Sequence, residues 1–466
     1  MATRILLPRF ELLGGWERDE KFRDALRLKS AWATTDEHVI GAVYFFEPEG
    51  YFTYVLLVAD ETGRYHTFFY ATPLATSRAA ESSIKSDLEL IESGGKPAPV
   101  PAPVEFGVNL FTTALTDKPN QKFLNLRDGR HSIATKKAIS EVARWFTDLD
   151  GNFVKDFQTT GYDSRLWELY LFASLTELGF SIVWDKPVPD FCLSRNDQKI
   201  FIEAVTANPS NGQQFDISGP PPPPPEDFAH YIEHVMPQKF GSPLRSKVMK
   251  EYWKAPDVAG NPFLIAIADF HAPASMTWSQ TALSFYLYGV GVELHPDLPN
   301  YKKTIDKPLG DHVVGSKVVP TNFFGNDAHR HISAVMFSNA GTNAKFNRMG
   351  VLAGFGDPEV KLIREGGLYN YEPGAVDATH FKINVENPAY EEHWADELEI
   401  YHNPNALVPL DFALLPTLTH FYLKDGELVW HGSERRVLYS ITHVRAPRDN
   451  KKKPTDADED EAHADD

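Results

Sequence analysis

The hydrophobic pattern of the first hundred residues predicts a small α+β unit. Residues 38–58 contain two runs rich in Val, Tyr and Phe around a Pro-Glu-Gly turn, which is typical of a β-hairpin. Residues 65–70 predict a third strand, and the apolar spacing of residues 77–92 predicts a helix. We therefore expect an N-terminal α+β domain at residues 1–95, followed by a linker at 96–104 whose alternating prolines favour an extended chain.

The next part of the chain predicts a mixed α/β core at residues 105–340. Its apolar spacing predicts the elements 132–148 (helix), 162–180 (helix), 181–185 (strand), 188–206 (hairpin), 243–254 (helix), 262–269 (buried strand), 278–290 (helix) and 331–341 (strand). We expect the helix at 243–254 to begin at Ser242-Pro243, because proline is favoured in the first turn. The polyproline loop at 219–225 is predicted to lie on the surface, because proline cannot donate hydrogen bonds to a sheet.

The last part of the chain predicts a mostly β region at residues 341–446. Strands are expected near residues 419–423, 427–431 and 436–443. Where this region begins, the tract 337–350 carries Lys345 and Arg348 among Asn and Gly, which suits a loop that binds an anion, although turn chemistry alone also explains it. Residues 447–466 are rich in Lys, Asp and Glu and are predicted to be a disordered charged tail.

Composition and charge exclude several classes of protein. The length of 466 residues and the hydrophobic share of 42% indicate a globular protein of two or three units. Because 64 Asp and Glu outnumber 46 Lys and Arg, a globally basic nucleic-acid coat is excluded. The single cysteine, Cys192, excludes an internal disulfide framework and a cysteine-based zinc site, so we expect a cytoplasmic protein. We find no secretion signal and no apolar stretch long enough to span a membrane.

Glu168 is the first residue with candidate chemistry. On the predicted helix its neighbours three, four and seven positions later are Leu171, Phe172 and Leu175, so its carboxylate shares the apolar stripe that faces the core. A buried carboxylate must be paired, neutralised or bound to a cation. Either Glu168 takes part in a polar site, or it forms a salt bridge with Arg165 one turn earlier.

The hairpin at 188–206 brings two more carboxylates together. If its turn centres on Asn196-Asp197, the antiparallel register sets Asp190 directly opposite Glu203. Like charges in opposed positions repel, and a divalent cation between them would convert the repulsion into ligation. The strand around Glu203 is apolar on both faces and is therefore predicted to be central. The alternative is a register shifted by one residue, with two unrelated acidic residues.

Three short motifs follow one another in the order Glu168, Pro189-Asp190 and Glu203-Ala204-Val205. This pattern resembles the PD-(D/E)xK nuclease superfamily. The resemblance implies a mixed-sheet, restriction-endonuclease-like core and a metal-dependent nuclease that hydrolyses phosphodiester bonds. It also implies that Asp190 and Glu203 bind Mg²⁺ or Mn²⁺, with Glu168 as the helix carboxylate.

One position departs from that family. The family has a lysine two residues after the acidic residue of the strand, where it orients the attacking water, and this chain has Val205 there. Either a lysine reaches the site from another element, or catalysis relies on metal ions alone. Lys247, on the predicted helix 243–254, is our candidate for the displaced lysine.

Basic segments are candidates for phosphate contacts, because an acidic protein would bind nucleic acid through local patches. We assign such contacts to Lys136, Lys137, Arg245 and Lys250. The alternative is that these lysines and arginines belong to ordinary solvated faces.

The sequence therefore predicts a metal-dependent nuclease with the catalytic residues Glu168, Asp190, Glu203 and Lys247. DNA is the expected substrate and RNA the alternative, and prokaryotic defence against foreign DNA is the role that the resemblance suggests. The competing hypothesis is an inactive nuclease-fold scaffold that binds nucleic acid or a protein partner. A protein bound to the polyproline loop or the acidic tail, and a second copy of the chain, are the candidate partners.

Overall fold

The computed structural model of the chain shows a mixed α/β protein with several sheets, the largest of which has eight strands. It describes residues 2–17, 25–95, 107–112, 118–184, 189–195, 197–209, 225–294, 304–372, 375, 377–432 and 435–445. Four predicted features lie outside the described residues: the linker 96–104, Asn196 of the hairpin turn, residues 219–224 of the polyproline loop and the tail 447–466.

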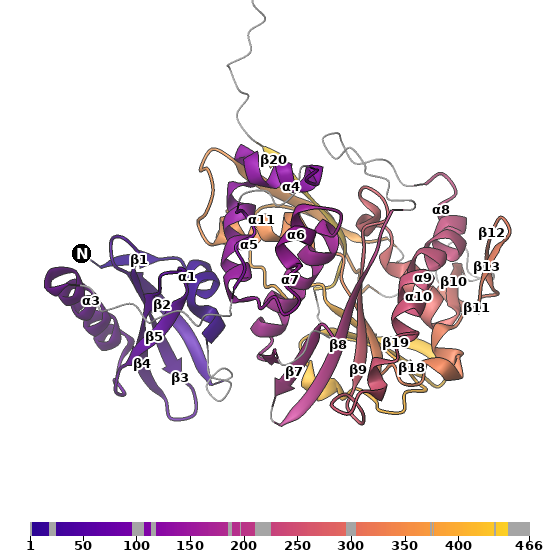
Figure 1. The fold of residues 1–466 in the computed structure, drawn as a ribbon, viewed down its shortest axis with the longest axis horizontal. Helices are drawn as coiled ribbons and strands as arrows, with labels where there is room; N and C mark the ends of the chain where they lie inside the picture. The colour runs from indigo at the N-terminus through magenta and orange to yellow at the C-terminus, as the bar shows by residue number, and fades with distance from the viewer. Residues whose placement is uncertain are drawn as a thin grey trace, which may run out of the picture.

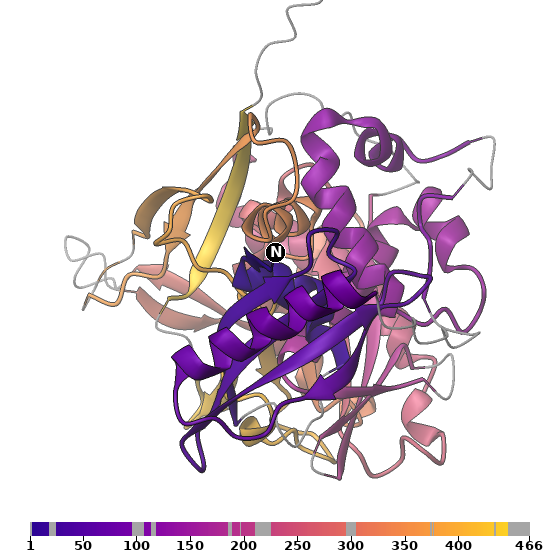
Figure 2. The same cartoon turned by 90° about the vertical axis from the view of Figure 1, so that its left-hand side faces the viewer.

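The N-terminal part of the chain forms a five-stranded antiparallel sheet with a helix on each face (Figure 1). The strands lie in chain order: β1 Thr3–Ile5, β2 Leu26–Ala33, β3 Val39–Phe46, β4 Tyr51–Ala59 and β5 Tyr65–Tyr70. Helix α1 (Leu7–Gly14) packs Phe10 against one face. Helix α3 (Ser77–Gly94) packs Ile84 against the other and lies across the outward side of the sheet (Figure 2). The predicted hairpin, third strand and helix of this region are confirmed.

A mixed sheet forms the centre of the rest of the molecule, in the order β19-β18-β17-β14-β9-β8-β7-β6. Its strands are β6 Ser181–Val183, β7 Phe191–Arg195, β8 Gln198–Ala207, β9 Phe263–Asp269, β14 Ala334–Phe337, β17 Glu399–His402, β18 Thr419–Lys424 and β19 Glu427–His431. Strands β6, β7 and β8 are antiparallel, whereas β8, β9 and β14 run parallel. Parallel neighbours need a crossover connection, and helices supply it here.

Helices cover both faces of this sheet, which explains why its central strands are apolar on both sides. One face carries α4 Gln121–Asp128, α5 Ile133–Trp145, α6 Phe153–Gln158, α7 Tyr162–Glu177 and α11 Asn343–Leu352. The other face carries α9 Met236–Val248 and α10 Gln280–Tyr288. Helix α7 is buried along its whole central part, from Leu166 to Thr176. No helix in the described residues has both the length and the apolar character needed to cross a bilayer.

The strands of the predicted C-terminal region are divided between two sheets. Strands β17, β18 and β19 belong to the central sheet, where β17 pairs antiparallel with β14. A smaller sheet contains β15 Lys361–Leu368, β16 Thr379–Asn384 and β20 Val437–Arg445. Two-stranded pairs are formed by β10 Val290–Leu294 with β11 Thr304–Pro308, and by β12 His312–Val314 with β13 Lys317–Val319. Strand pairing between β14 and β17 crosses the predicted boundary at residue 340, and such pairing between distant strands leaves no local pattern.

The helix after the β7–β8 hairpin begins earlier than predicted. Helix α9 follows a short helix α8 (Phe228–His230) and a π-helical turn (Tyr231–Val235). The predicted start at Ser242-Pro243 is wrong, because Pro243 lies inside α9. Apolar side chains along α9 pack in the core of this face, and that packing outweighs the hydrogen bond lost at the proline.

Candidate active site

Asp190 and Glu203 lie side by side at the β7–β8 hairpin. Phe191 pairs with Ile202, so that Asp190, one position earlier, faces Glu203. The Oδ2 atom of Asp190 accepts a hydrogen bond from the backbone N–H of Ala204 at 2.7 Å. The Oε2 atom of Glu203 accepts one from the backbone N–H of Asp190 at 3.4 Å. The predicted register is therefore confirmed.

Glu203 is a carboxylate in the interior of the sheet. Strand β8 lies between β7 and β9, and Glu203 pairs with Ile265 of β9. Its exposed fraction is 2%. A buried charge of this kind needs a compensating partner, because removing it from water is costly.

Lys247 supplies that partner. Its Nζ atom donates a hydrogen bond to Oε1 of Glu203 at 2.5 Å. Helix α9 is the crossover between the parallel strands β8 and β9, and this path brings its last turn to the carboxylates. Burial disfavours the charged form of Lys247. The negative charges of Glu203 and Asp190 outweigh this effect and raise the pKa of Lys247. A lysine thus reaches the carboxylates from another element, whereas Val205 itself lines the cavity without a polar group.

Glu168 meets both expectations that the sequence left open. It is buried on α7 and lines the same cavity as Asp190 and Glu203. It also forms the salt bridge with Arg165, whose Nη1 lies 2.9 Å from Oε2 of Glu168. Burial comes first among the causes that raise the pKa of Glu168, and the charge of Asp190 adds to it.

These side chains line a cavity of about 450 Å³, which we call the acidic cavity. Its charged lining consists of five acidic side chains and two basic ones: Asp150, Asp156, Glu168, Asp190, Glu203, Arg165 and Lys247. Burial raises the pKa of the Asp190 carboxyl as well. It also raises the pKa of Glu203, with a further contribution from the charge of Asp190. Two cations therefore do not balance the negative charge at this site.

Several residues that line the acidic cavity were not predicted from the sequence. Asp156, on α6, accepts a hydrogen bond from Nη2 of Arg165 at 2.7 Å and so links two elements of the wall. The hydroxyls of Ser164 and Thr206 are 2.8 Å apart and connect α7 to β8. Tyr252, just beyond α9, completes this set. These residues carry no local motif, since only the packing of α6, α7 and β8 brings them together.

The four predicted phosphate-contact residues lie elsewhere. Lys136 and Lys137, on α5, line a different cavity. Arg245 interacts electrostatically with Tyr286 of α10, and Lys250 is exposed beyond the end of α9. None of the four belongs to the described lining of the acidic cavity.

A second buried carboxylate, Glu392, has the opposite surroundings. Lys345 donates to it at 2.8 Å, and Nη2 of Arg348 at 2.7 Å. The Nη1 atom of Arg364 lies 3.5 Å away, and the hydroxyl of Tyr390 donates at 2.5 Å. Burial opposes the ionised form, but Arg348 and Lys345 hold the pKa of Glu392 far below its usual range.

This cluster also corrects the prediction for the tract 337–350. Lys345 and Arg348 do not lie in an anion-binding loop, because most of that tract forms helix α11. Both side chains are buried and bind the protein's own carboxylate. The Asn and Gly residues of the tract had suggested a loop, and the distant partner was invisible in the sequence.

Within the described residues, no group of three or more His, Cys, Asp and Glu side chains is arranged to hold a metal ion. Comparison of the chain with models of known families, with curated proteins and with solved structures gives no match.

Proposed function

We propose that the protein is a metal-dependent nuclease whose active site is the acidic cavity. The observation that carries the proposal is the ion pair between Lys247 and Glu203, with Asp190 hydrogen-bonded beside them. Two carboxylates and a lysine are the groups that the resemblance to PD-(D/E)xK nucleases calls for. Here the lysine comes from α9 instead of from the position of Val205.

The arrangement of the elements supports the same proposal. Helix α7, strand β6, the β7–β8 hairpin, helix α9 and strand β9 follow one another in the order that a restriction-endonuclease-like core requires. The three acidic residues of the motif come from α7, from the residue before β7 and from β8. All three line one cavity.

The residues of the acidic cavity fit a divalent cation. Asp190 and Glu203 would hold Mg²⁺ or Mn²⁺, because both offer carboxylate oxygens, the donors that these ions prefer. Burial raises both pKa values, and the charge of Asp190 raises that of Glu203 further; a bound cation would favour the ionised form of both. Magnesium commonly uses only one or two protein carboxylates, together with water and substrate phosphate. When bound, such an ion activates a water molecule and stabilises the leaving oxygen.

The protein's own groups supply the rest of the reaction. Hydrolysis adds a water oxygen to phosphorus, breaks the bond to the leaving oxygen and transfers a proton to that oxygen. Lys247 is positioned to donate a hydrogen bond from Nζ to the attacking water or to a phosphate oxygen. Glu168, whose pKa is raised, is suited to accept the proton of the water.

The test is cleavage of a panel of DNA and RNA by the purified full chain with Mg²⁺ or Mn²⁺. We expect activity that EDTA abolishes and that Asp190→Asn lowers by about 10³-fold or more. The matched control is Asp425→Asn in the β18–β19 turn, where φ is 54° and asparagine is well tolerated.

Equal cleavage by the wild type and Asp190→Asn would contradict the proposal. No cleavage of any polymer, combined with binding of nucleic acid or protein, would instead favour the inactive scaffold.

A further inference from the structure

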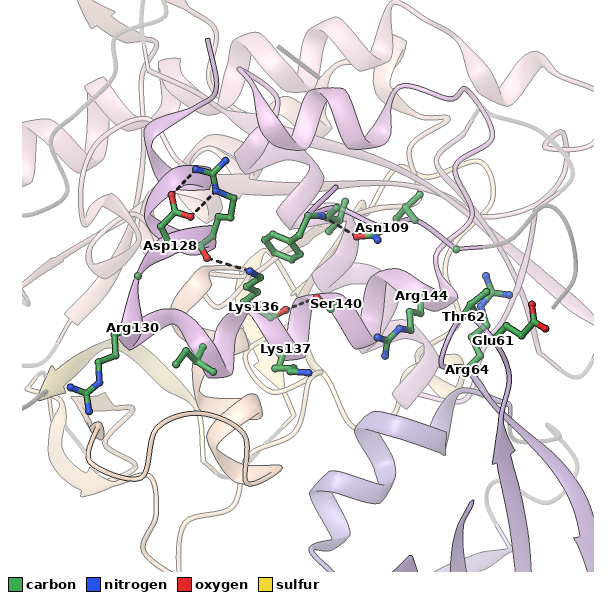
Figure 3. Close-up of a pocket in the computed structure, with 17 residues that line it drawn as sticks. Glu61, Thr62, Arg64, Asn109, Asp128, Arg130, Lys136, Lys137, Ser140 and Arg144 are labelled. Atoms are coloured by element: carbon green, nitrogen blue, oxygen red, sulfur yellow. Dashed lines mark hydrogen bonds and ion pairs between the residues drawn. The ribbon is translucent and has the colours of Figure 1, made fainter. Parts of the chain in front are cut away.

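A second cavity, of about 820 Å³, lies where the N-terminal sheet meets helices α4 and α5 (Figure 3). Its walls come from the turn between β4 and β5, from residues 107–111, from the end of α4 and from one face of α5. We call it the basic cavity. None of its described lining residues belongs to the acidic cavity.

The sequence of α5 gives this cavity its charge. Ile133, Lys136, Lys137, Ser140 and Arg144 lie three, four, seven and eleven positions along one face, and all of them line the cavity. The opposite face of α5 is apolar and packs in the core. The helix thus presents its cationic face to the cavity.

Arg64, in the turn between β4 and β5, is the decisive residue. It is 3% exposed, and its Nε and Nη2 atoms have no hydrogen-bond partner among the described residues. The nearby carboxylate of Asp60 is engaged by other groups: Oδ1 accepts from Thr62 and from the backbone of Arg64, and Oδ2 lies 3.0 Å from the ring of His66. The Cζ atom of Arg64 lies 5.6 Å from the centroid of the Trp145 ring, but the ring offers Nε and Nη2 no acceptor atom. Buried donors without an acceptor are unfavourable unless a ligand supplies one.

Most of the charged side chains that line the basic cavity are cations, like Arg64. Six basic side chains line the cavity against two acidic ones: Arg64, Arg127, Arg130, Lys136, Lys137 and Arg144 against Glu61 and Asp128. Arg127 pairs with Asp128, Arg130 with Asp357 and Glu359, and Arg144 with Glu141. Arg64, Lys136 and Lys137 form no such ion pair in the described part of the chain. Nζ of Lys136 donates to the backbone oxygen of Arg127 at 3.3 Å, but that oxygen is neutral, and an anion in the cavity would supply a counter-charge to these groups.

The cavity also has an aromatic wall. Phe111 lines it and stacks on Phe123 with ring centroids 6.0 Å apart. The Nζ atom of Lys136 lies 5.0 Å from the ring of Phe111, so a cation and a planar apolar surface are neighbours. Arg64 and Arg144 lie toward one end of the cavity, and Asp128 and Arg130 toward the other (Figure 3).

We propose that the basic cavity binds a nucleotide, with its phosphates on Arg64 and the α5 lysines and its base against Phe111. The volume falls in the range of small-molecule sites, which is about 300–1,000 Å³. Because Arg64 is nearly inaccessible, a terminal phosphate inserted into the cavity fits better than the backbone of a strand passing over its mouth. The proposal does not depend on nuclease activity at the acidic cavity.

The test is calorimetric titration of the full chain, in EDTA, with ATP, AMP, adenosine and inorganic phosphate. We expect saturable binding of ATP or AMP that is weakened about 100-fold in Arg64→Met, because a charge-assisted pair of hydrogen bonds is lost. The melting temperature of ligand-free Arg64→Met should be unchanged or higher, since an unpaired buried charge is removed. Arg78→Met, on the exposed side of α3, is the matched control and should bind like the wild type.

Equal affinity of the wild type and Arg64→Met, or no nucleotide binding at millimolar concentration, would overturn the proposal. Inorganic phosphate binding as tightly as ATP would overturn the nucleotide assignment. Binding of a single-stranded oligonucleotide that ATP does not displace would point to a strand groove instead. If Arg64→Met fails to fold, Lys137→Gln on the exposed face of α5 should weaken ATP binding about tenfold, and unchanged affinity there would also overturn the proposal.

Discussion

Glu203 and Glu392 are two carboxylates buried to a similar degree whose surroundings shift the pKa in opposite directions. Glu392 has lysine and arginine partners in direct contact, so its charge is neutralised within the protein. Glu203 also has a lysine in direct contact, but five acidic groups share two basic ones in its cavity, so the charge of that cluster is not balanced within the protein. Burial alone therefore does not determine the direction of the pKa shift, whereas the local charge balance does. The charges of the first cluster are compensated within the protein, whereas the second cluster has more acidic than basic groups.

The largest effect that tests this contrast concerns Lys247. We expect Lys247→Ala to lower the turnover number for nucleic-acid cleavage by about 10³-fold, because the cation that orients water is lost. Substrate affinity should change little, because a single orienting group contributes mainly in the transition state. Single-turnover and steady-state kinetics on the same substrate measure the two quantities. Lys250→Ala, three positions later and exposed, is the control; a similar loss in both variants would remove Lys247 from the site.

The second effect concerns stability. Glu392→Gln should lower the free energy of unfolding by about 3–5 kcal/mol, because it leaves buried cations without their counter-charge. Asp190→Asn should leave the stability of the metal-free protein unchanged or raise it, because it removes repulsion at the acidic cavity. Urea unfolding at pH 7.5 in EDTA measures both variants. A loss of the same size in both would show that the two clusters do not differ in charge balance.

A smaller effect is the dependence of stability on pH. Burial raises the pKa of Glu168 to about 8 and that of Glu203 to about 7. Between the ordinary carboxyl pKa and these values, the folded protein holds protons that the unfolded chain has released, so stability falls as pH rises from 5 to 8. The melting temperature in EDTA should therefore drop by a few degrees over this interval, as expected for about 1 kcal/mol.

Metal and substitution should both weaken that pH dependence. Mg²⁺ or Mn²⁺ should raise the melting temperature at pH 8 more than at pH 5, because the ion binds the deprotonated carboxylates. Asp190→Asn should flatten the profile, because the repulsion that raises the two pKa values is reduced. A wild-type profile that rises with pH in EDTA would contradict the assignment of these carboxyls.

The part of the candidate site that depends on local structure could be predicted from the sequence. The turn expected at Asn196-Asp197 predicted the hairpin register, which places Asp190 opposite Glu203. The position of Glu168 on the apolar stripe of its helix showed that this charge faces the interior. Lys247 was predicted to reach the site because it lies on the helix that follows the hairpin. The predicted start of that helix was wrong.

What the sequence did not reveal depends on contacts between distant segments. The ion pairs of Lys345 and Arg348 with Glu392 join residues more than forty positions apart, so the tract around them was mistaken for a loop. Arg64 is an ordinary turn residue in the sequence and becomes unusual only when α5 and residues 107–111 bury it. The pairing of β17 with β14 likewise leaves no trace in either strand.

The order of strands in the central sheet also bears on how the protein folds during synthesis. Strands β6 to β9 emerge from the ribosome long before β17, β18 and β19, which complete the other side of the same sheet. Until Glu399–His402 is available, the apolar strand Ala334–Phe337 has an unpaired edge, which is a template for association with other chains. The nascent chain therefore passes through a stage in which the central sheet ends at the unpaired edge of β14, and association with other chains is favoured at this stage.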